Sequence, residues 1–372
     1  MYNWSQFLKE SPVDWLLEKM NPCVRYFTLR DILAKSGENS QIVAAKRAIP
    51  ESRVVKRILR KQNPEGYWEE PANPYHPKYK SSYWQIMTLG QLGVDKTNER
   101  VKKACEYIFQ LEDGGFSSYT EERAARDYKR LLENGKMLRS RREWIPLLVF
   151  EHQYSCLTGN MVAALIRLGY EDDLRVNKAV EWLIKIQNVD GGWLCPYWKA
   201  HIKDKHGCFH GTICTLEAFS EIKTEHLTKK MNDAIEKGAE FLLIHRLFKA
   251  DHHDYKVINQ SWLKFGFPWF WRYNVLRGLD VLTKLGYVTD ERLSDTVQVL
   301  LQKRREDGTW VLESAPIGRM QANIEAKGKP SKWVTLIALR ILKRLKSSEI
   351  KTANQDEEAQ EAINHICPKT MK

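Results

Sequence analysis

The sequence lacks any uninterrupted apolar run close to the roughly 20 residues that a membrane-spanning helix needs. Its first 20 residues carry acids and tryptophans and lack the basic-then-apolar order of a secretion signal. Cysteine is sparse and odd in number, seven in 372 residues, which argues against a framework of disulfides. We therefore expect a soluble, cytoplasmic protein whose thiols are buried, catalytic or bound to a metal.

Acidic residues are too few to balance the basic ones. The chain has 59 Lys and Arg against 47 Asp and Glu, a net charge of +12. This excess indicates an anionic partner, such as a diphosphate, a nucleic acid or an acidic membrane surface. A solvated basic surface explains it equally well. The densest cluster, at 46–61, has the spacing of the outer face of a helix.

A short motif recurs along the chain. Each copy follows a helical segment and has a polar or acidic residue, a glycine and then an aromatic residue. A glycine at a helix end takes a positive φ, the chain reverses, and the aromatic side chain packs back. The interval between the last two copies, 117 residues, is about twice the repeat, so we place a worn copy without glycines at 239–246. The four clear copies end at Trp68, Phe116, Trp193 and Trp310.

A second type of helix alternates with the first and carries leucines at three- and four-residue spacing, which marks one buried face. About six such pairs account for residues 1–347 as one all-α domain, with a basic insertion near 119–151 and a polar tail at 348–372. Closure of the hairpins gives an (α/α)6 toroid whose inner helices line a central cavity. An open helical solenoid is the competing arrangement. The inner helices are predicted near residue 25 and in SYWQIMTLGQLGV, YSCLTGNMVAALIRLGY, GTICTLEAFSEI, YNVLRGLDVLTKLGY and KWVTLIALRILKRL.

The Gly-Gly-aromatic turn after a helix that ends in glutamine resembles the prenyltransferase and squalene-oxidase repeat, over about residues 54–345. That resemblance implies the α/α toroid of terpene cyclases and of protein prenyltransferase β subunits. It says little about chemistry, because this toroid hosts different activities.

In a closed toroid the loops before the inner helices meet at one rim, which would gather thiols and imidazoles from neighbouring hairpins. Zinc takes tetrahedral sulfur and nitrogen ligands, so we predict a zinc site there. The alternative is that the cysteines are small apolar fillers at helix starts. The candidate ligands are Cys156, Cys195, Cys208, His206 and His210.

The resemblance fits this site only in part. Protein prenyltransferase β subunits have Asp-x-Cys at the start of an inner helix and a histidine one hairpin later. Here His206-Gly207-Cys208 stands in the first place and the second offers Asn274, so only Cys208 matches. The α subunit that such an enzyme needs is also missing. Protonating terpene cyclases use an Asp-x-Asp-Asp acid, which this sequence does not contain.

Aromatic and basic residues supply the predicted substrate contacts. Aromatic faces can line an isoprenoid pocket and stabilise a cation, although core packing explains them as well. A basic loop before the last inner helix, together with that helix start, suits a diphosphate; a solvated loop is the alternative. The insertion at 119–151 is a candidate lid or partner-docking element. The predicted substrate-binding residues are Trp262, Trp269, Trp271, Arg319, Lys329 and Lys332.

We thus expect a terpene cyclase-like or prenyltransferase-like protein that binds, and acts on, an isoprenoid or similar apolar substrate at the toroid mouth, with zinc as its cofactor. Two alternatives stay open. One is a non-catalytic module that binds a lipid, a peptide or an anion. The other is a zinc toroid enzyme of the lanthionine-cyclase type. We expect no nucleic-acid partner, and a protein partner remains compatible with the sequence.

Overall fold

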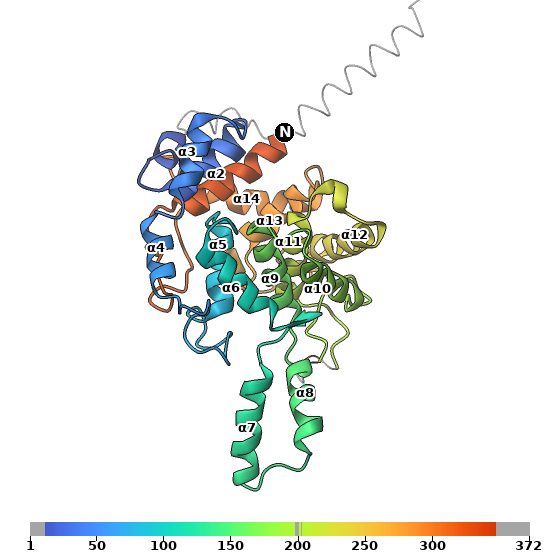
Figure 1. Ribbon diagram of the computed structural model, residues 1–372. Coiled ribbons are helices and arrows are strands. Elements are labelled where there is room, and N and C mark those ends of the chain that lie inside the picture. Colours follow the sequence, from blue (N-terminus) through green and yellow to red (C-terminus); the bar gives the residue numbers. More distant parts are fainter. Residues whose placement is uncertain (1–11, 198–200, 202, 347–372) are drawn as a thin grey trace, which may run out of the picture.

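The computed structural model describes residues 12–197, 201 and 203–346, and two kinds of helix alternate along them (Figure 1). The inner helices are mostly buried, and every residue of α5 is buried. The outer helices bury one face. The inner helices are α2 (Pro22–Phe27), α5 (Ser82–Gln91), α9 (Ser155–Arg167), α11 (Phe209–Glu221), α13 (Val275–Lys284) and a last helix over 332–346. The outer helices are α4 (Arg53–Arg60), α6 (Glu99–Phe109), α10 (Leu174–Lys185), α12 (Lys229–Ile244) and α14 (Ser294–Gln302).

Smaller elements complete the chain. The two β ribbons are short, and the prediction of an all-α protein is confirmed. The predicted tail at 348–372 lies outside the described residues. Within the described ranges, no helix combines the length and apolarity needed to cross a bilayer. The smaller elements are α1 (Val13–Leu16), the π-helix η2 (Thr28–Ile32), α3 (Ser40–Ala48), β1 (Glu112–Asp113), β2 (Gly115–Phe116), η3 (Thr224–His226), β3 (Lys249–Ala250), β4 (Lys256–Val257), η4 (Gln260–Leu263) and η5 (Glu291–Leu293).

The inner helices close into a ring, as the toroid prediction requires. Neighbouring inner helices from α5 to α13 pack against each other in chain order. The last helix then contacts α13 through Arg344 and Asp280, 2.8 Å apart. It also contacts the first hairpin through Arg340 and Asp31, 2.6 Å apart. The chain therefore forms a toroid and not an open solenoid.

The recurring Gly-aromatic turn has one geometry at its tryptophan copies. The indole Nε1 of Trp193 donates to the carbonyl of Leu183 at 2.7 Å, and its backbone N–H donates to Thr212 Oγ1 at 2.9 Å. Both bonds tie the turn to its own outer helix and to the next inner helix. Trp68 and Trp310 repeat this pattern, with Ser82 and Thr335 as the hydroxyl partners.

The glutamine before each of two turns links neighbouring hairpins. The amide of Gln187 donates to the carbonyl of Gly191 at 2.8 Å and to that of Ala234 on α12 at 2.9 Å.

The predicted worn copy is also present as the end of α12. There Arg246 and Leu247 take the positive φ values, 43° and 69°, that glycine supplies elsewhere.

A segment between η4 and α13 enters the ring and fills its middle. We call residues 267–271 the aromatic plug. Gln91 on α5 exchanges two hydrogen bonds with the backbone of Trp269, at 2.7 and 2.8 Å. Asn160 on α9 donates to the carbonyl of Phe270 at 3.0 Å. Phe267 stacks on Trp333 of the last helix, with ring centroids 4.3 Å apart. The predicted central cavity is therefore divided into two mouths.

The basic insertion forms a helical hairpin that stands away from the ring (Figure 1). It consists of α7 (Glu121–Glu133) and α8 (Arg141–Glu151). Backbone bonds at its base join it to the body, including one from Ser118 N–H to the carbonyl of His152 at 3.0 Å.

Candidate functional site: two mouths of one ring

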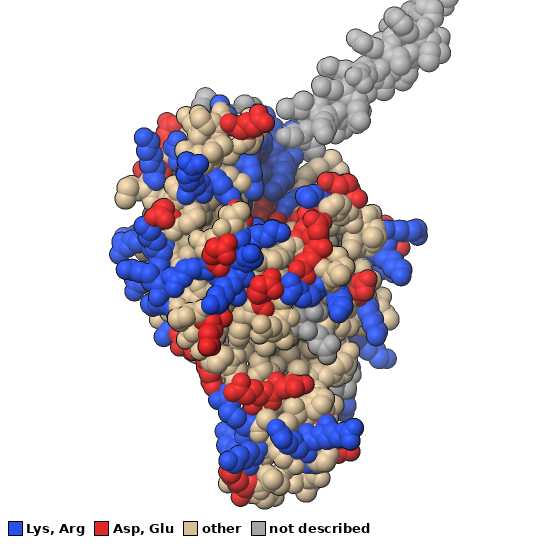
Figure 2. Space-filling view, viewed as in Figure 1, with Lys and Arg blue, Asp and Glu red and all other residues tan. Residues whose placement is uncertain are grey.

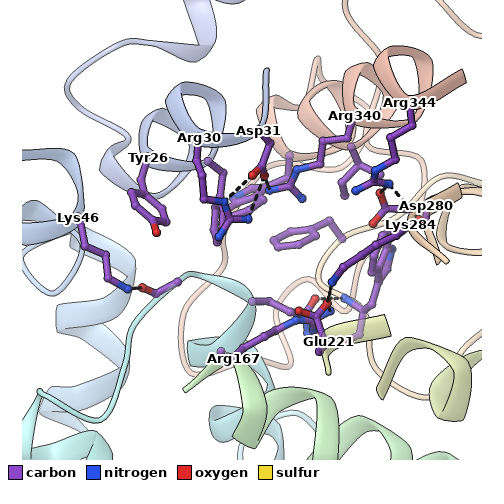
Figure 3. Close-up of a pocket in the computed structure, with 18 residues that line it drawn as sticks. Tyr26, Arg30, Asp31, Lys46, Arg167, Glu221, Asp280, Lys284, Arg340 and Arg344 are labelled. Carbon is purple, nitrogen blue, oxygen red and sulfur yellow. Dashed lines mark hydrogen bonds and ion pairs between the residues drawn. The ribbon is translucent and has the colours of Figure 1, made fainter. Parts of the chain in front are cut away.

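A charged cavity with a volume of about 330 Å³ opens at the carboxyl ends of the inner helices (Figure 3). We call it the cationic mouth. Its floor is aromatic and includes Phe267 and Trp269 of the plug together with Phe27 and Trp333. Its walls are charged, with six cationic side chains against three carboxylates. The charged lining residues are Arg30, Lys46, Arg167, Lys284, Arg340, Arg344, Asp31, Glu221 and Asp280.

Ion pairs hold the wall of the cationic mouth together. Asp31 contacts both Arg30 and Arg340, at 2.5 and 2.6 Å (Figure 3). Burial raises the pKa of Asp31, but the two guanidinium groups outweigh it and keep that pKa below its usual value. Asp31 is therefore ionised at neutral pH, and the pair acts as a fixed charge.

The far side of the same wall has an equivalent arrangement. Glu221 contacts Lys284 at 2.6 Å and Arg167 at 2.9 Å. Burial favours the neutral acid, but these two cations lower the pKa of Glu221 well below its usual range. Neither carboxylate is therefore a proton donor at neutral pH, which agrees with the missing Asp-x-Asp-Asp acid.

Arg340 has donor capacity that the described residues do not use. The carboxyl ends of helices favour cations, so part of the positive charge here stabilises the fold. The Nε of Arg340, however, is buried and has no hydrogen-bond partner among the described residues. The same guanidinium lies 5.0 Å from the centroid of the Phe27 ring. A buried donor without an acceptor is costly, so a bound anion would stabilise it.

The opposite end of the ring contains the predicted thiols, because Cys156 and Cys208 lie at the amino ends of α9 and α11. We call Ser155, Cys156, Cys195, His201 and Cys208 the thiol cluster. Ser155 Oγ lies 3.8 Å from the sulfur of Cys195. Interaction with Cys156 and with His201 lowers the pKa of Cys195, although burial opposes this.

The predicted histidine ligands face other groups. His206 packs on the rings of Phe241 and His245, with centroids 5.2 and 5.3 Å away. The Nδ1 of His210 accepts a hydrogen bond from Tyr273 N–H at 2.8 Å. No three His, Cys, Asp or Glu side chains in the described ranges are arranged to hold a metal ion. Zinc therefore remains a prediction from the sequence.

The predicted aromatic contacts divide between core and cavity. Trp269 lines the cationic mouth and a second cavity of about 290 Å³ on the other side of the plug. Trp262 packs on Phe209 and Tyr273, in the hydrophobic core. Trp271 lies against His210, and its indole N–H is buried without a partner among the described residues.

The predicted basic contacts do not converge. Arg319 lines the second cavity beside the plug. Lys329 is exposed, and Lys332 pairs with Glu18 at 2.6 Å. The start of the last helix is already capped by Glu325, whose carboxylate accepts from the backbone N–H of Lys332 at 2.7 Å. The predicted anion position is therefore taken by a carboxylate of the chain itself.

Except for Trp269, the residues that line the cationic mouth were missed at the sequence level, the charged ones above all. A signal for them exists, because several inner helices carry a basic residue near the end of the apolar segment. Arg167, Lys284 and Arg340 occupy such positions. Ring closure brings equivalent ends of neighbouring inner helices together, so these basic side chains line the same cavity.

No protein-family model and no curated protein sequence matches the chain. Among solved structures, the chain is similar to a protein from Actinoplanes, with 13% identity and a TM-score of 0.41, over 88% of this chain and 90% of that chain. It is also similar to the type II terpene cyclase MstE from Scytonema, with 14% identity and a TM-score of 0.43, over 90% and 88%. A variant of MstE in complex with geranylgeranyl dihydroxybenzoate has 15% identity and a TM-score of 0.42, over 91% and 98%. The toroid itself is established by the contacts that close the ring.

Proposed function

We propose that the protein binds an isoprenoid or a similar apolar substrate at the cationic mouth and acts on it there. An anionic head group, such as a diphosphate, would contact Arg340 and the cations around it. The apolar chain would lie against Phe267, Trp269 and Trp333. The observation that carries this proposal is the buried Nε of Arg340, which has no hydrogen-bond partner in the described part of the chain and lies beside an aromatic floor. Charge and apolar surface in one cavity suit an amphiphile better than a purely polar or purely apolar ligand.

The activity that we favour is that of an isoprenoid transferase or cyclase. Aromatic faces stabilise carbocations, and the floor of the cationic mouth provides several of them. The carboxylates of the cationic mouth are paired with cations of the protein and do not supply a proton. The site therefore suits a reaction in which the substrate ionises by losing its anionic group. A non-catalytic module with the same pocket would bind the substrate without converting it.

Binding of three probes tests the proposal. Titration calorimetry compares geranylgeranyl diphosphate, the uncharged geranylgeraniol and inorganic diphosphate. We expect the diphosphate lipid to bind more tightly than either part alone, because only it uses both the charges and the aromatic floor. Replacing Arg340→Gln removes a charge-assisted hydrogen bond and should weaken that binding on the order of tenfold or more.

Arg305→Gln is the matched control, since Arg305 is exposed and its ion pair within the described ranges is with Asp307, at 3.4 Å. It should bind like the unmodified protein. Equal affinity for the alcohol and the diphosphate, or equal loss in both variants, would refute the proposed site. Mass spectrometry of the incubated lipid then separates an enzyme from a binding module.

A further inference from the structure

The projecting hairpin of α7 and α8 has apolar residues and no core to bury them in. Helix α8 has 11 residues with the sequence RREWIPLLVFE, and none of them is buried. In α7 only Ala124 is buried. The two helices touch through Tyr128 and Trp144, whose ring centroids are 5.8 Å apart. The hairpin therefore keeps its shape with most apolar side chains of α8 half-buried and others exposed to solvent.

The most exposed of these side chains lie toward the free end. Leu138, in the loop between the helices, is 98% exposed, and Leu132 is 55% exposed. Phe150, nearer the base, is 44% exposed. Exposed leucines at the free end of a projecting element offer an apolar surface to a partner.

The same free end is strongly basic. We call residues 129–142 the hairpin tip. It has six Lys and Arg residues and one Glu, a net charge of +5. Figure 2 shows Lys and Arg gathered over this end of the molecule. Lys136, Arg139, Arg141 and Arg142 make no ion pair with a described residue, so their charge is available to a partner.

We propose that the hairpin tip docks on an anionic lipid surface. Leucine side chains at the tip enter the boundary between head groups and acyl chains, and the surrounding Lys and Arg contact the anionic head groups. A nucleic acid would use the charges and leave Leu138 in water, so the combination favours lipid. Helix α8 is about 16 Å long, too short to cross a bilayer, so the tip lies in the interface.

Vesicle flotation of the full-length protein tests this docking. One set of vesicles contains phosphatidylcholine alone and the other contains phosphatidylcholine with phosphatidylglycerol. We expect binding to the second set, with a steep decrease as salt is raised. The double variant Arg139→Gln, Arg142→Gln should lose about thirtyfold in partitioning, from about 1 kcal/mol for each basic residue at the surface. Leu138→Ser should weaken binding to the same vesicles without changing its salt dependence.

Matched controls lie on the body of the ring. Arg57→Gln with Arg60→Gln removes two exposed cations from α4, and Leu174→Ser removes an apolar side chain that is 76% exposed. Both should bind vesicles normally. Anionic vesicles should also protect the bonds after Lys136 and Arg139 from trypsin. Failure to bind anionic vesicles, equal losses in the control variants, or tip-dependent binding of RNA in place of vesicles would overturn the proposal.

Discussion

Replacing Arg277→Met should destabilise the ring more than any surface substitution, because this arginine joins the inner helices to the aromatic plug. Its side chain is fully buried. Its Nε donates to Glu217 Oε2 at 2.5 Å, and one Nη donates to Asn160 Oδ1 at 2.7 Å. The other Nη donates to the carbonyl of Phe270 in the plug. One residue thus connects α13, α11, α9 and the plug.

The magnitude follows from what the substitution leaves behind. Glu217 is only 3% exposed and would keep one cation, Arg167. Burial raises the pKa of Glu217, whereas Arg277 and Arg167 lower it below its usual value. Breaking a buried pair typically costs about 3–5 kcal/mol, and we expect the lower end because Arg167 remains. The free energy of unfolding should therefore fall by about 3 kcal/mol.

Urea unfolding at neutral pH, followed by circular dichroism, measures this change. The double variant Arg277→Met, Glu217→Gln should recover part of the loss, because it no longer leaves a carboxylate that has lost its main partner. Arg292→Met is the control, since its pairs with Asp290 and Glu240 are partly exposed, and it should cost about 1 kcal/mol or less. A loss below about 1 kcal/mol for Arg277→Met would refute the central role assigned to this residue.

Three further expectations concern acid, turns and metal. The folded-state pKa of Glu221 lies below the ordinary value of 4.5, so its contribution to stability is complete above that pH and is lost as pH falls. The free energy of unfolding of Glu221→Gln, plotted against pH, should therefore be flatter in acid than that of the unmodified protein. An unchanged slope would contradict this. Gly191→Ala should lower the free energy of unfolding by more than about 1 kcal/mol, because φ is +86° and the added Cβ would lie 2.3 Å from a carbonyl oxygen. Gly135→Ala is the control: its added Cβ meets no close contact, so it should lower the free energy of unfolding only by the cost of a left-handed backbone. Elemental analysis of protein purified under reducing conditions should find near one equivalent of zinc, and Cys208→Ala should lose it; less than one equivalent would contradict the predicted site.

The fold could be predicted in detail because its signals are local and repeated. The glycine–aromatic turns and the alternation of two helix types place the hairpins, and even the worn copy at 239–246 is a helix end. The turns also contain a signal that the sequence reading did not use. A Ser or Thr in the next inner helix, such as Thr212, accepts the backbone N–H of the turn aromatic.

The site was harder to predict because it depends on where the chain returns to itself. Arg340 and Asp31 are far apart in the sequence, and only ring closure places them 2.6 Å apart. The thiols illustrate the opposite case. Cys156 and Cys195 do meet at one rim as expected, but the nearby imidazole is His201, and the predicted His206 and His210 pack against other rings. Spacing placed the thiols at one rim and could not choose among the nearby histidines.

The aromatic plug limits the path of a ligand through the ring. Trp269 borders the spaces on both of its sides, so the toroid is not a tube. A long hydrocarbon entering at the charged end meets a floor and has to coil above it or stop. A ligand bound above this floor would leave by the route through which it entered. It would reach the sulfur atoms at the far end only if the plug moved and broke its backbone hydrogen bonds to Gln91 and Asn160.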